Sequence, residues 1–315
     1  MILTVTLNAA VDRTLTVPNF DVGFRHRASG TLTLAGGKGI NVARVVKTLG
    51  QPVIATGFAG GRTGDRIIAD LNREGILSDF VRIEDVSRTS TAVLDPTSNR
   101  TTEINEYGPD ISAEELELML EKLDYLVKAA DLVVLAGSLP RGLSSGFYAE
   151  LIPRLKQTSV PVLFDTYGEA LRLGVRAGPD VVFPNQEEAE MVVGYEFTSN
   201  EDFIRAAGNL RELGAVSVVI KSRLGCVAQV EEGETVRTLM GKAPQVEAVS
   251  TVGSGDSMVG GYAARLLEGA PPEECIRFGL ACAAANALRL GAGVLDPEDA
   301  RRLAPGVDVE EVTPV

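Results

Sequence analysis

Short apolar runs alternate with amphipathic stretches along most of the chain. The apolar runs are rich in β-branched residues, as buried strands are, and lie at 2–7, 53–58, 132–136, 160–164, 181–183 and 217–220. The amphipathic stretches have the periodicity of helices and lie at 40–49, 65–73, 113–128, 145–156, 186–193 and 202–213. Strands and helices in alternation predict a mostly parallel sheet that helices cover on both faces.

Two regions lack this alternation and contain no helical pattern. Residues 14–34 and 89–107 alternate like exposed antiparallel strands, with a turn signal at 95–99. We expect them to form a small β-sheet, inserted into the main domain as a lid. The predicted division is therefore a core of 1–13, 35–88 and 108–315, and a lid of 14–34 and 89–107. Three further helices are predicted at 257–268, 273–290 and 296–303.

The net charge of the chain limits the classes of partner that it can bind. With 30 Lys and Arg against 43 Asp and Glu, the net charge is −13, which disfavours nucleic acid and anionic membrane surfaces as partners. Three cysteines without metal-ligand spacing suit a reducing cytoplasm. The single histidine, His26, excludes most histidine-rich metal sites.

The first of two glycine clusters spans 35–41 and runs into a predicted helix. Glycines before a helix let backbone N–H groups approach an anion, and Lys38 adds a positive charge there. No Ser or Thr follows this lysine, as a Walker A loop requires, and the third glycine of a dinucleotide fingerprint is absent. A glycine-rich turn with one solvated lysine explains the cluster equally well.

The second cluster, Gly253-Ser254-Gly255-Asp256, precedes a helix of small residues. Successive amides at a helix start stabilise developing negative charge, and Asp256 beside them could take a proton from a hydroxyl that attacks a phosphate. A plain helix cap explains Ser254 and Asp256 as well.

Two more carboxylate sites follow predicted strands. Asp12 projects from the carboxyl end of the first strand, where open α/β sheets bind ligands, although a solvated turn residue is the simpler interpretation. Asn185 and Glu188 could hold a hydrated Mg²⁺, since that ion prefers oxygen ligands. An acidic helix start is the alternative for this pair.

Six segments occur in order along nearly the whole chain: LNAAVD at 7–12, GGKGINVAR at 36–44, TEINEYGP at 102–109, GSLP at 137–140, PNQEE at 184–188 and STVGSGD at 250–256. In this order they resemble the PfkB family of ribokinase-like carbohydrate kinases, and within it the branch that contains 1-phosphofructokinase and tagatose-6-phosphate kinase. The resemblance implies a three-layer α/β/α domain with an inserted β-sheet lid. It also implies transfer of the γ-phosphoryl group of ATP, with Mg²⁺, to a sugar phosphate.

The resemblance assigns roles to individual residues. Asp256 corresponds to the catalytic base, and the anion hole to Gly253, Ser254 and Gly255. The residues on the substrate side would be Asp12, Arg25, Gly37, Lys38, Asn41, Arg88 and Ser138. The residues near ATP would be Asn185, Lys221, Ser222, Gly225, Leu280 and Ala284. Mg²⁺ would lie near Asn185 and Glu188.

Two positions depart from the family pattern. Ala9 stands where the branch usually has proline, and Phe183 stands where a lysine often precedes the Pro-Asn pair. We hypothesise that Lys221 or Arg223 replaces that missing cation.

The sequence leaves several functions open. Phosphorylation of fructose 1-phosphate at its 6-hydroxyl is the leading interpretation, and the segment 102–105 favours it mildly. Tagatose 6-phosphate and fructose 6-phosphate are alternative substrates. A non-catalytic regulator that binds sugar phosphates is an alternative of another class, because fold alone does not establish function. A nicotinamide-dependent oxidoreductase is disfavoured by the missing fingerprint.

Two further expectations concern assembly and ions. A homodimer through the lids is expected from the exposed edges of the small sheet and from the family habit. A K⁺ ion, if one is required, would bind at the backbone around Ser250, Val252 and 286–291.

Overall fold

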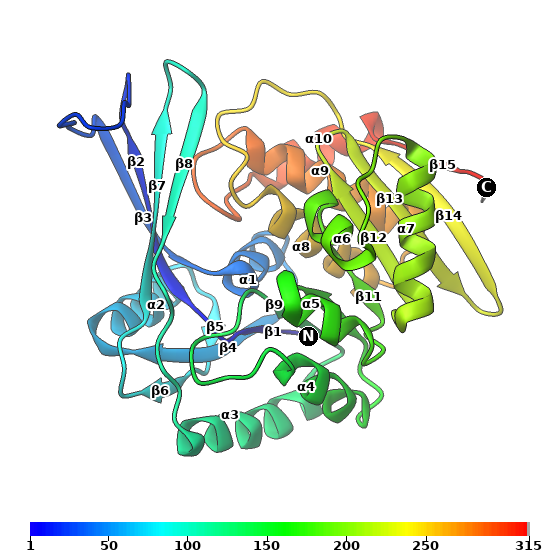
Figure 1. Ribbon diagram of the computed structural model, residues 1–315, viewed down its shortest axis with the longest axis horizontal. Helices are drawn as coiled ribbons and strands as arrows, with labels where there is room; N and C mark the ends of the chain where they lie inside the picture. The colour runs from blue at the N-terminus through cyan, green and yellow to red at the C-terminus, as the bar shows by residue number, and fades with distance from the viewer. Residues whose placement is uncertain (314–315) are drawn as a thin grey trace.

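A large, mostly parallel sheet is the middle layer of the fold (Figure 1). The computed structural model of the protein describes residues 1–313. The sheet has the strand order β15-β14-β13-β12-β11-β10-β9-β1-β4-β5, and β6 also pairs with β4. The parallel part comprises β1 (Ile2–Thr6), β4 (Val53–Gly60), β5 (Leu77–Ser78), β6 (Val81–Ile83), β9 (Leu132–Ala136), β10 (Val162–Asp165), β11 (Val181–Val182) and β12 (Ser217–Ser222). An antiparallel edge follows, with β13 (Gly225–Glu232), β14 (Thr235–Lys242) and β15 (Asp308–Glu311).

Helices cover both faces of this sheet because its central strands are apolar on both sides. In β9, Leu132 and Val134 face one hydrophobic cluster, and Val133 and Leu135 face the other. The first face is covered by α1 (Lys38–Thr48), α2 (Gly61–Arg73), α8 (Ser254–Leu267) and α9 (Pro272–Ala287). The second is covered by α3 (Ala113–Leu126), α4 (Phe147–Lys156), α5 (Gly168–Val175), α6 (Gln186–Val193) and α7 (Asn200–Leu213). The predicted three-layer α/β/α fold is confirmed.

The remaining elements close the C-terminal part. Helix α10 (Pro297–Leu303) packs on α9, and two short 3₁₀ helices span Val127–Ala129 and Ala304–Gly306. In the described part of the chain, none of the helices has both the length and the apolar character needed to cross a bilayer.

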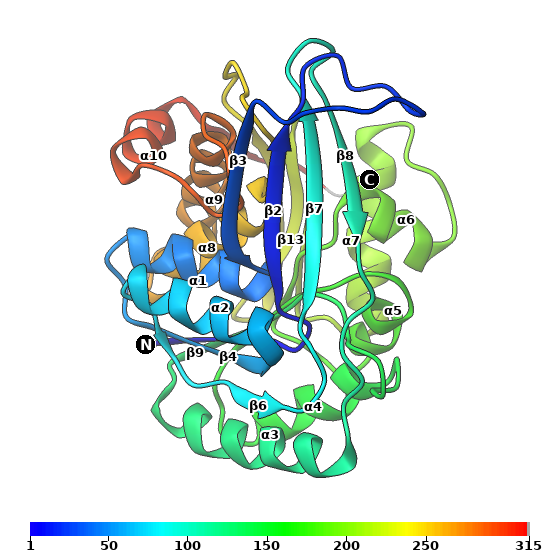
Figure 2. The ribbon, with the colours of Figure 1, turned by 90° about the vertical axis from the view of Figure 1, so that its left-hand side faces the viewer.

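A second, four-stranded sheet stands beside the core, as Figure 2 shows face-on. Its order is β3-β2-β7-β8, with β2 (Ala10–Thr16), β3 (Gly30–Gly36), β7 (Arg88–Asp95) and β8 (Arg100–Asn105). The small separate sheet is thus confirmed, but β2 and β7 pair in parallel rather than antiparallel. Its strands also include residues 10–13 and 35–36, which the sequence division placed in the core. Its movement as a lid stays a prediction.

Several elements were missed or misjudged from the sequence. Helix α5 and strands β13 to β15 were not predicted, because α5 is short and begins and ends near glycines, β13 and β14 form a hairpin outside the alternation of strands and helices, and β15 is short and polar. Helix α2 begins at Gly61 rather than at 65, since its first turn carries no apolar periodicity. Helix α9 ends at Ala287 rather than at 290, because the Ala287 carbonyl oxygen accepts from the backbone N–H groups of Val249 and Ser250.

The contact of α8 with α1 generates a prediction on stability. A Cβ atom at Gly260 would lie 2.8 Å from Val45 Cβ. In Gly260→Ala, overpacking of about 1–3 kcal/mol should exceed the helix-propensity gain of up to about 1 kcal/mol. The free energy of unfolding in urea should therefore fall. The matched control is Gly208→Ala in α7, where the nearest atom would be 3.7 Å away and stability should be kept or raised. A Gly260→Ala variant as stable as the control would contradict the tight contact.

Candidate active site

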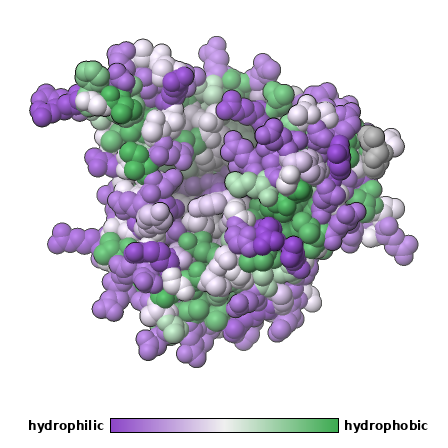
Figure 3. Space-filling view, in the orientation of Figure 1, coloured by the Kyte–Doolittle hydropathy of each residue, from purple (hydrophilic) through white to green (hydrophobic). Residues whose placement is uncertain are grey.

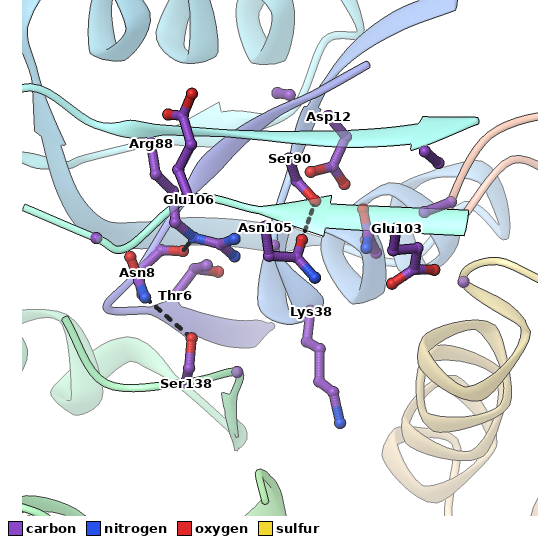
Figure 4. Close-up of a pocket in the computed structure, with 18 of the residues that line it drawn as sticks. Thr6, Asn8, Asp12, Lys38, Arg88, Ser90, Glu103, Asn105, Glu106 and Ser138 are labelled. Carbon is purple, nitrogen blue, oxygen red and sulfur yellow. Dashed lines mark hydrogen bonds between the residues drawn. The ribbon is translucent and has the colours of Figure 1, made fainter. Parts of the chain in front are cut away.

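A cavity of about 590 Å³ lies between the four-stranded sheet and the carboxyl ends of the parallel strands. Figure 3 shows the molecular surface hollowed between the two sheets, and Figure 4 shows the side chains that line the hollow. The lining includes residues that follow β1, β3 and β9, and the start of α8. This is the edge at which open α/β sheets bind ligands.

The inner face of the four-stranded sheet brings polar side chains into one row. Strand register pairs Asp12 with Ser90, and Ser90 with Asn105. All three line the cavity, and the Ser90 hydroxyl donates to Asn105 Oδ1 (Figure 4). Glu103 lies on the same face, whereas Ile104 between them is 60% exposed and does not line the cavity. The segment 102–105 thus contributes two polar groups to the site.

Asp12 depends on a glycine for its position. A Cβ atom at Gly36 would lie 2.0 Å from Asp12 Oδ2, so the carboxylate occupies the space that a side chain at Gly36 would need. Burial raises the pKa of Asp12, and the positive charges of Arg88 and Arg44 offset part of that increase. Asp12 is thereby placed to accept hydrogen bonds from ligand hydroxyl groups.

Two guanidinium groups lie at the base of the four-stranded sheet. Arg88 Nε donates to the Asn8 carbonyl oxygen at 3.2 Å, and Asn8 Nδ2 donates to Ser138 Oγ at 3.0 Å (Figure 4). Arg141 also lines the cavity, with Nε donating to the Gly108 carbonyl oxygen at 2.8 Å. Arginines beside a hydroxyl and an amide are suited to a phosphate group.

Asp256 is buried in the first turn of α8. Its Oδ2 accepts a hydrogen bond from Asn41 Nδ2 at 2.8 Å. Burial raises the pKa of Asp256 to about 6, although the positive charge of Lys38 lowers it. A carboxylate with such a pKa is ionised near neutral pH and is a stronger base than an ordinary aspartate.

The turn before Asp256 is a tight glycine-containing turn that leads into α8. Gly253 caps α8 with φ 81°, and a Cβ atom there would lie 2.4 Å from Ala292 Cα. The Ser254 N–H donates to the Thr251 carbonyl oxygen at 3.2 Å. The amides of the next residues belong to the first turn, where helices lack internal acceptors. The anion hole predicted at Gly253, Ser254 and Gly255 stays a prediction for these amides.

Asp165, at the end of β10, holds two lysines together. Lys38 Nζ donates to Asp165 Oδ1 at 2.7 Å, and Lys221 Nζ donates to Asp165 Oδ2 at 2.6 Å. Burial alone would raise the pKa of Asp165, but the two ammonium groups outweigh burial and lower it. A Cβ atom at Gly255 would lie 3.6 Å from Lys221 Nζ. The lysine pair therefore lies next to the start of α8.

The predicted metal motif forms a capping box at the start of α6. Asn185 Oδ1 accepts from the Glu188 N–H at 2.8 Å, and Glu188 Oε2 accepts from the Asn185 N–H at 2.7 Å. Glu188 Oε1 lies 3.5 Å from Lys38 Nζ and so faces the lysine pair. Within residues 1–313, no group of three or more His, Cys, Asp and Glu side chains is placed to hold a metal ion.

The other predicted site residues are more dispersed. Arg25 is exposed in the loop between β2 and β3 and is not among the cavity residues. Ser222 and Gly225 lie at the turn between β12 and β13, where Ser222 Oγ donates to the Gly225 carbonyl oxygen at 3.2 Å. Leu280 and Ala284 are buried in α9. Gly37, Lys38 and Asn41, which the sequence assigned to the substrate side, all line the cavity.

Sequence reasoning missed two residues of the site. Asp165 follows an apolar strand directly, which is the signal that singled out Asp12. Arg141 follows the GSLP segment, and nothing in its local sequence marks it as a cavity residue.

The fold and the cavity together define a class of protein. A buried base, a glycine-capped helix start and clustered cations are the parts of a phosphoryl-transfer enzyme that acts on a small hydroxyl compound. Residues 5–299 match the pfkB family carbohydrate kinases. The chain belongs to this family and is a sugar kinase, as its resemblance implied.

Curated relatives match the chain over nearly its full length. It is 33% identical to a 1-phosphofructokinase from Borreliella burgdorferi, over 99% of each chain. It is 31% identical to a tagatose-6-phosphate kinase from Staphylococcus epidermidis, over 99% of this chain and 100% of the relative. Both enzymes of the predicted branch are thus among the relatives.

Solved structures have the same fold. A possible 1-phosphofructokinase from Thermotoga maritima has a TM-score of 0.90 and 28% identity, over 99% of this chain and 100% of that one. Phosphofructokinase-2 from Escherichia coli in complex with potassium has a TM-score of 0.88 and 29% identity, over 97% and 98% of the two chains. Arabidopsis thaliana ribokinase, at 22% identity and a TM-score of 0.73 over 96% and 98%, shares the fold.

The lysine pair generates a prediction about ATP. Lys221 is buried beside Asp165, whereas Arg223 is exposed in the following turn. In Lys221→Met, kcat/KM for ATP should fall by about 10- to 100-fold, the worth of a hydrogen bond to a charged phosphate. Arg223→Met is the matched control and should leave kcat/KM for ATP unchanged. Steady-state rates at varied ATP measure both, and equal values for the two variants would remove Lys221 from the nucleotide site.

Proposed function

We propose that the chain is an ATP-dependent 1-phosphofructokinase, which converts fructose 1-phosphate and ATP to fructose 1,6-bisphosphate and ADP. One observation carries the proposal. A single cavity contains a buried carboxylate with a raised pKa, Asp256, and a separate pair of guanidinium groups, Arg88 and Arg141. This arrangement suits a substrate that already carries a phosphate, because the guanidinium groups could bind that phosphate while Asp256 deprotonates a hydroxyl group elsewhere on the sugar.

The proposed reaction uses these groups in turn. Arg88, Arg141 and Ser138 bind the 1-phosphate, and Asp12 accepts hydrogen bonds from sugar hydroxyls. Asp256 takes the proton of the 6-hydroxyl as the new O–P bond forms and the bond between the γ-phosphorus and the ADP oxygen breaks. Lys38, Lys221 and the first amides of α8 stabilise the negative charge of the transferring group.

The nucleotide side of the proposal includes Mg²⁺. When bound, this ion supplies positive charge to the phosphate oxygens of ATP. Glu188 would hold it through water by its Oε1 atom, since Oε2 and Asn185 are engaged in the capping box. This fits Mg²⁺, which retains several waters and needs only one or two protein carboxylates.

We also propose that the enzyme binds K⁺ as a second ion. The structure of phosphofructokinase-2 from Escherichia coli in complex with potassium supports it. In this chain Asn286 Nδ2 donates to the carbonyl oxygens of Val252 at 3.3 Å and Gly291 at 3.2 Å. Each of these oxygens has a second lone pair that could coordinate K⁺ while the hydrogen bond from Asn286 is kept.

Fructose 1-phosphate is chosen over its two alternatives on two grounds. Relatives named 1-phosphofructokinase occur in four of the organisms compared, including Bacillus subtilis at 35% identity over 98% of this chain and 99% of the relative. In addition, Glu103 and Asn105 face the cavity from the segment that favoured this substrate.

The cytoplasm is proposed as the location, because ATP is the phosphoryl donor and the three buried cysteines are free thiols.

The proposed substrate is tested by a comparison of three sugar phosphates. Purified protein with Mg-ATP should give the highest kcat/KM with fructose 1-phosphate, above tagatose 6-phosphate and fructose 6-phosphate. Coupled ADP release measures all three rates. A higher kcat/KM for either of the other two would reassign the substrate.

The control for this comparison is Asp256→Asn. Loss of a general base costs about 10²- to 10⁴-fold in rate, so turnover of every substrate should fall while calorimetry still detects binding of fructose 1-phosphate. Unchanged turnover in this variant would remove Asp256 as the base.

A homodimer through the lids completes the proposal. Exposed apolar side chains occur on the outer face and loop of the four-stranded sheet, with Ile104 60%, Phe24 72% and Val22 86% exposed. Ile104→Lys should convert a dimer into a monomer of 33.3 kDa in sedimentation measurements. The control is Leu118→Lys on α3, which changes a similarly exposed leucine away from this sheet. A wild-type monomer, or a dimer of the Ile104→Lys variant, would contradict this interface.

A further inference from the structure

Arg44 is a buried cation of α1 that has no assigned role in the reaction. Its side chain is 7% exposed. Nη1 donates to Asn41 Oδ1 at 3.1 Å and to the Ala292 carbonyl oxygen at 2.9 Å. Nη2 donates to the Ala35 carbonyl oxygen at 2.6 Å and to Glu74 Oε1 at 3.1 Å, and Nε donates to Glu74 Oε2 at 2.5 Å. All five N–H donors of the guanidinium group therefore have acceptors.

These acceptors come from separate parts of the active site. Ala35 precedes Gly36, on which the Asp12 carboxylate rests. Ala292 lies against Gly253, the cap of α8. Arg44 thus links the base of the four-stranded sheet, the loop beside the predicted anion hole and the helix that carries Asn41.

The contact with Asn41 determines which way its amide points. A guanidinium group only donates hydrogen bonds, so Asn41 must present Oδ1 to Arg44. The other end of the amide, Nδ2, then donates to Asp256 Oδ2 at 2.8 Å. In the flipped amide, an NH₂ group would face the guanidinium group and a carbonyl oxygen would face the carboxylate. Both contacts would be repulsive.

We infer that Arg44 is a positioning residue, which fixes the amide of Asn41 and thereby keeps Asp256 ionised and oriented. The donated hydrogen bond stabilises the charged carboxylate and occupies Oδ2, which leaves Oδ1 for the proton of the substrate hydroxyl. This role rests on the proposed function of Asp256 as the base. Glu74 balances the charge of Arg44 and holds it from the end of α2.

The other charges around Asp256 do not depend on Arg44. Lys38, Asp165 and Lys221 act on the carboxylate from α1, β10 and β12, and they are bonded to one another. The charge of Arg44 also lowers the pKa of Asp12 directly, so the part of a pH shift that passes through Asn41 is identified by a double variant with Asn41→Ala.

The experiment is a pH profile of kcat/KM for Arg44→Met. Without the donor from Asn41, protonation of Asp256 becomes easier, so the acid limb of the profile should move up by about one pH unit. The activity ratio of wild type to variant should then be about fivefold larger at pH 6 than at pH 8.5. The phosphate of the substrate also titrates near pH 6, but equally in every variant.

A double variant and a structural control separate the two possible roles of Arg44. In the Asn41→Ala background, Arg44→Met should shift the acid limb by less than in the wild-type background, because part of its effect passes through Asn41. Val45→Ala removes a buried neighbour on α1 that faces Gly260. It should lower the melting temperature and leave the acid limb in place.

The outcomes distinguish this inference from the proposed function. If Arg44→Met does not fold, Arg44→Lys decides, because it retains the charge but cannot engage all these acceptors. A wild-type acid limb in the folded variant, or an additive shift in the double variant, overturns the role of Arg44. An Asp256→Asn enzyme that retains full turnover overturns the proposed base instead.

Discussion

The carboxylate of Asp256 lies buried at the start of α8, where an ionised group loses most of its hydration. Burial raises its pKa to about 6, which makes it a useful base but also disfavours its charged form. The surrounding structure compensates for this. Asn41 donates to one oxygen, the lysine pair supplies positive charge nearby, and the carboxylate lies in the first turn of α8, where the helix dipole favours negative charge. These groups come from α1, β12 and α8, which are distant in the sequence, so the site forms only when the core is folded.

The cavity brings several cations together in a molecule with an excess of acidic residues. The chain has a net charge of −13, yet cations line or support the cavity: Lys38, Arg44, Arg88, Arg141 and Lys221. Three of them are held by carboxylates: the buried Asp165 bonds both lysines, and the half-buried Glu74 bonds Arg44. Fixed cations of this kind need little reorganisation when an anion binds, which is how preorganised sites stabilise phosphoryl transfer.

Close approach of backbone to side chains explains why the glycine clusters are where they are. The Asp12 carboxylate occupies the space above Gly36, and Gly253 lies against Ala292 with a positive φ. A side chain at Gly36 would displace the Asp12 carboxylate, and one at Gly253 would collide with the backbone at Ala292. The clusters therefore serve the geometry of the cavity as much as the binding of an anion.

The sequence by itself determined the layered α/β core, because strand and helix periodicities are local properties of the chain. It also predicted that Asp256, Asp12 and Lys38 belong to one site, since they lie in short segments whose order along the chain is recognisable, and all three line the same cavity. Only the tertiary structure decided which side chains meet. Asp165 joins Lys38 and Lys221 across 127 and 56 residues, and Asn41 meets Asp256 across 215. The orientation of the Asn41 amide depends on such contacts, which local sequence does not encode because they arise only when the strand ends converge.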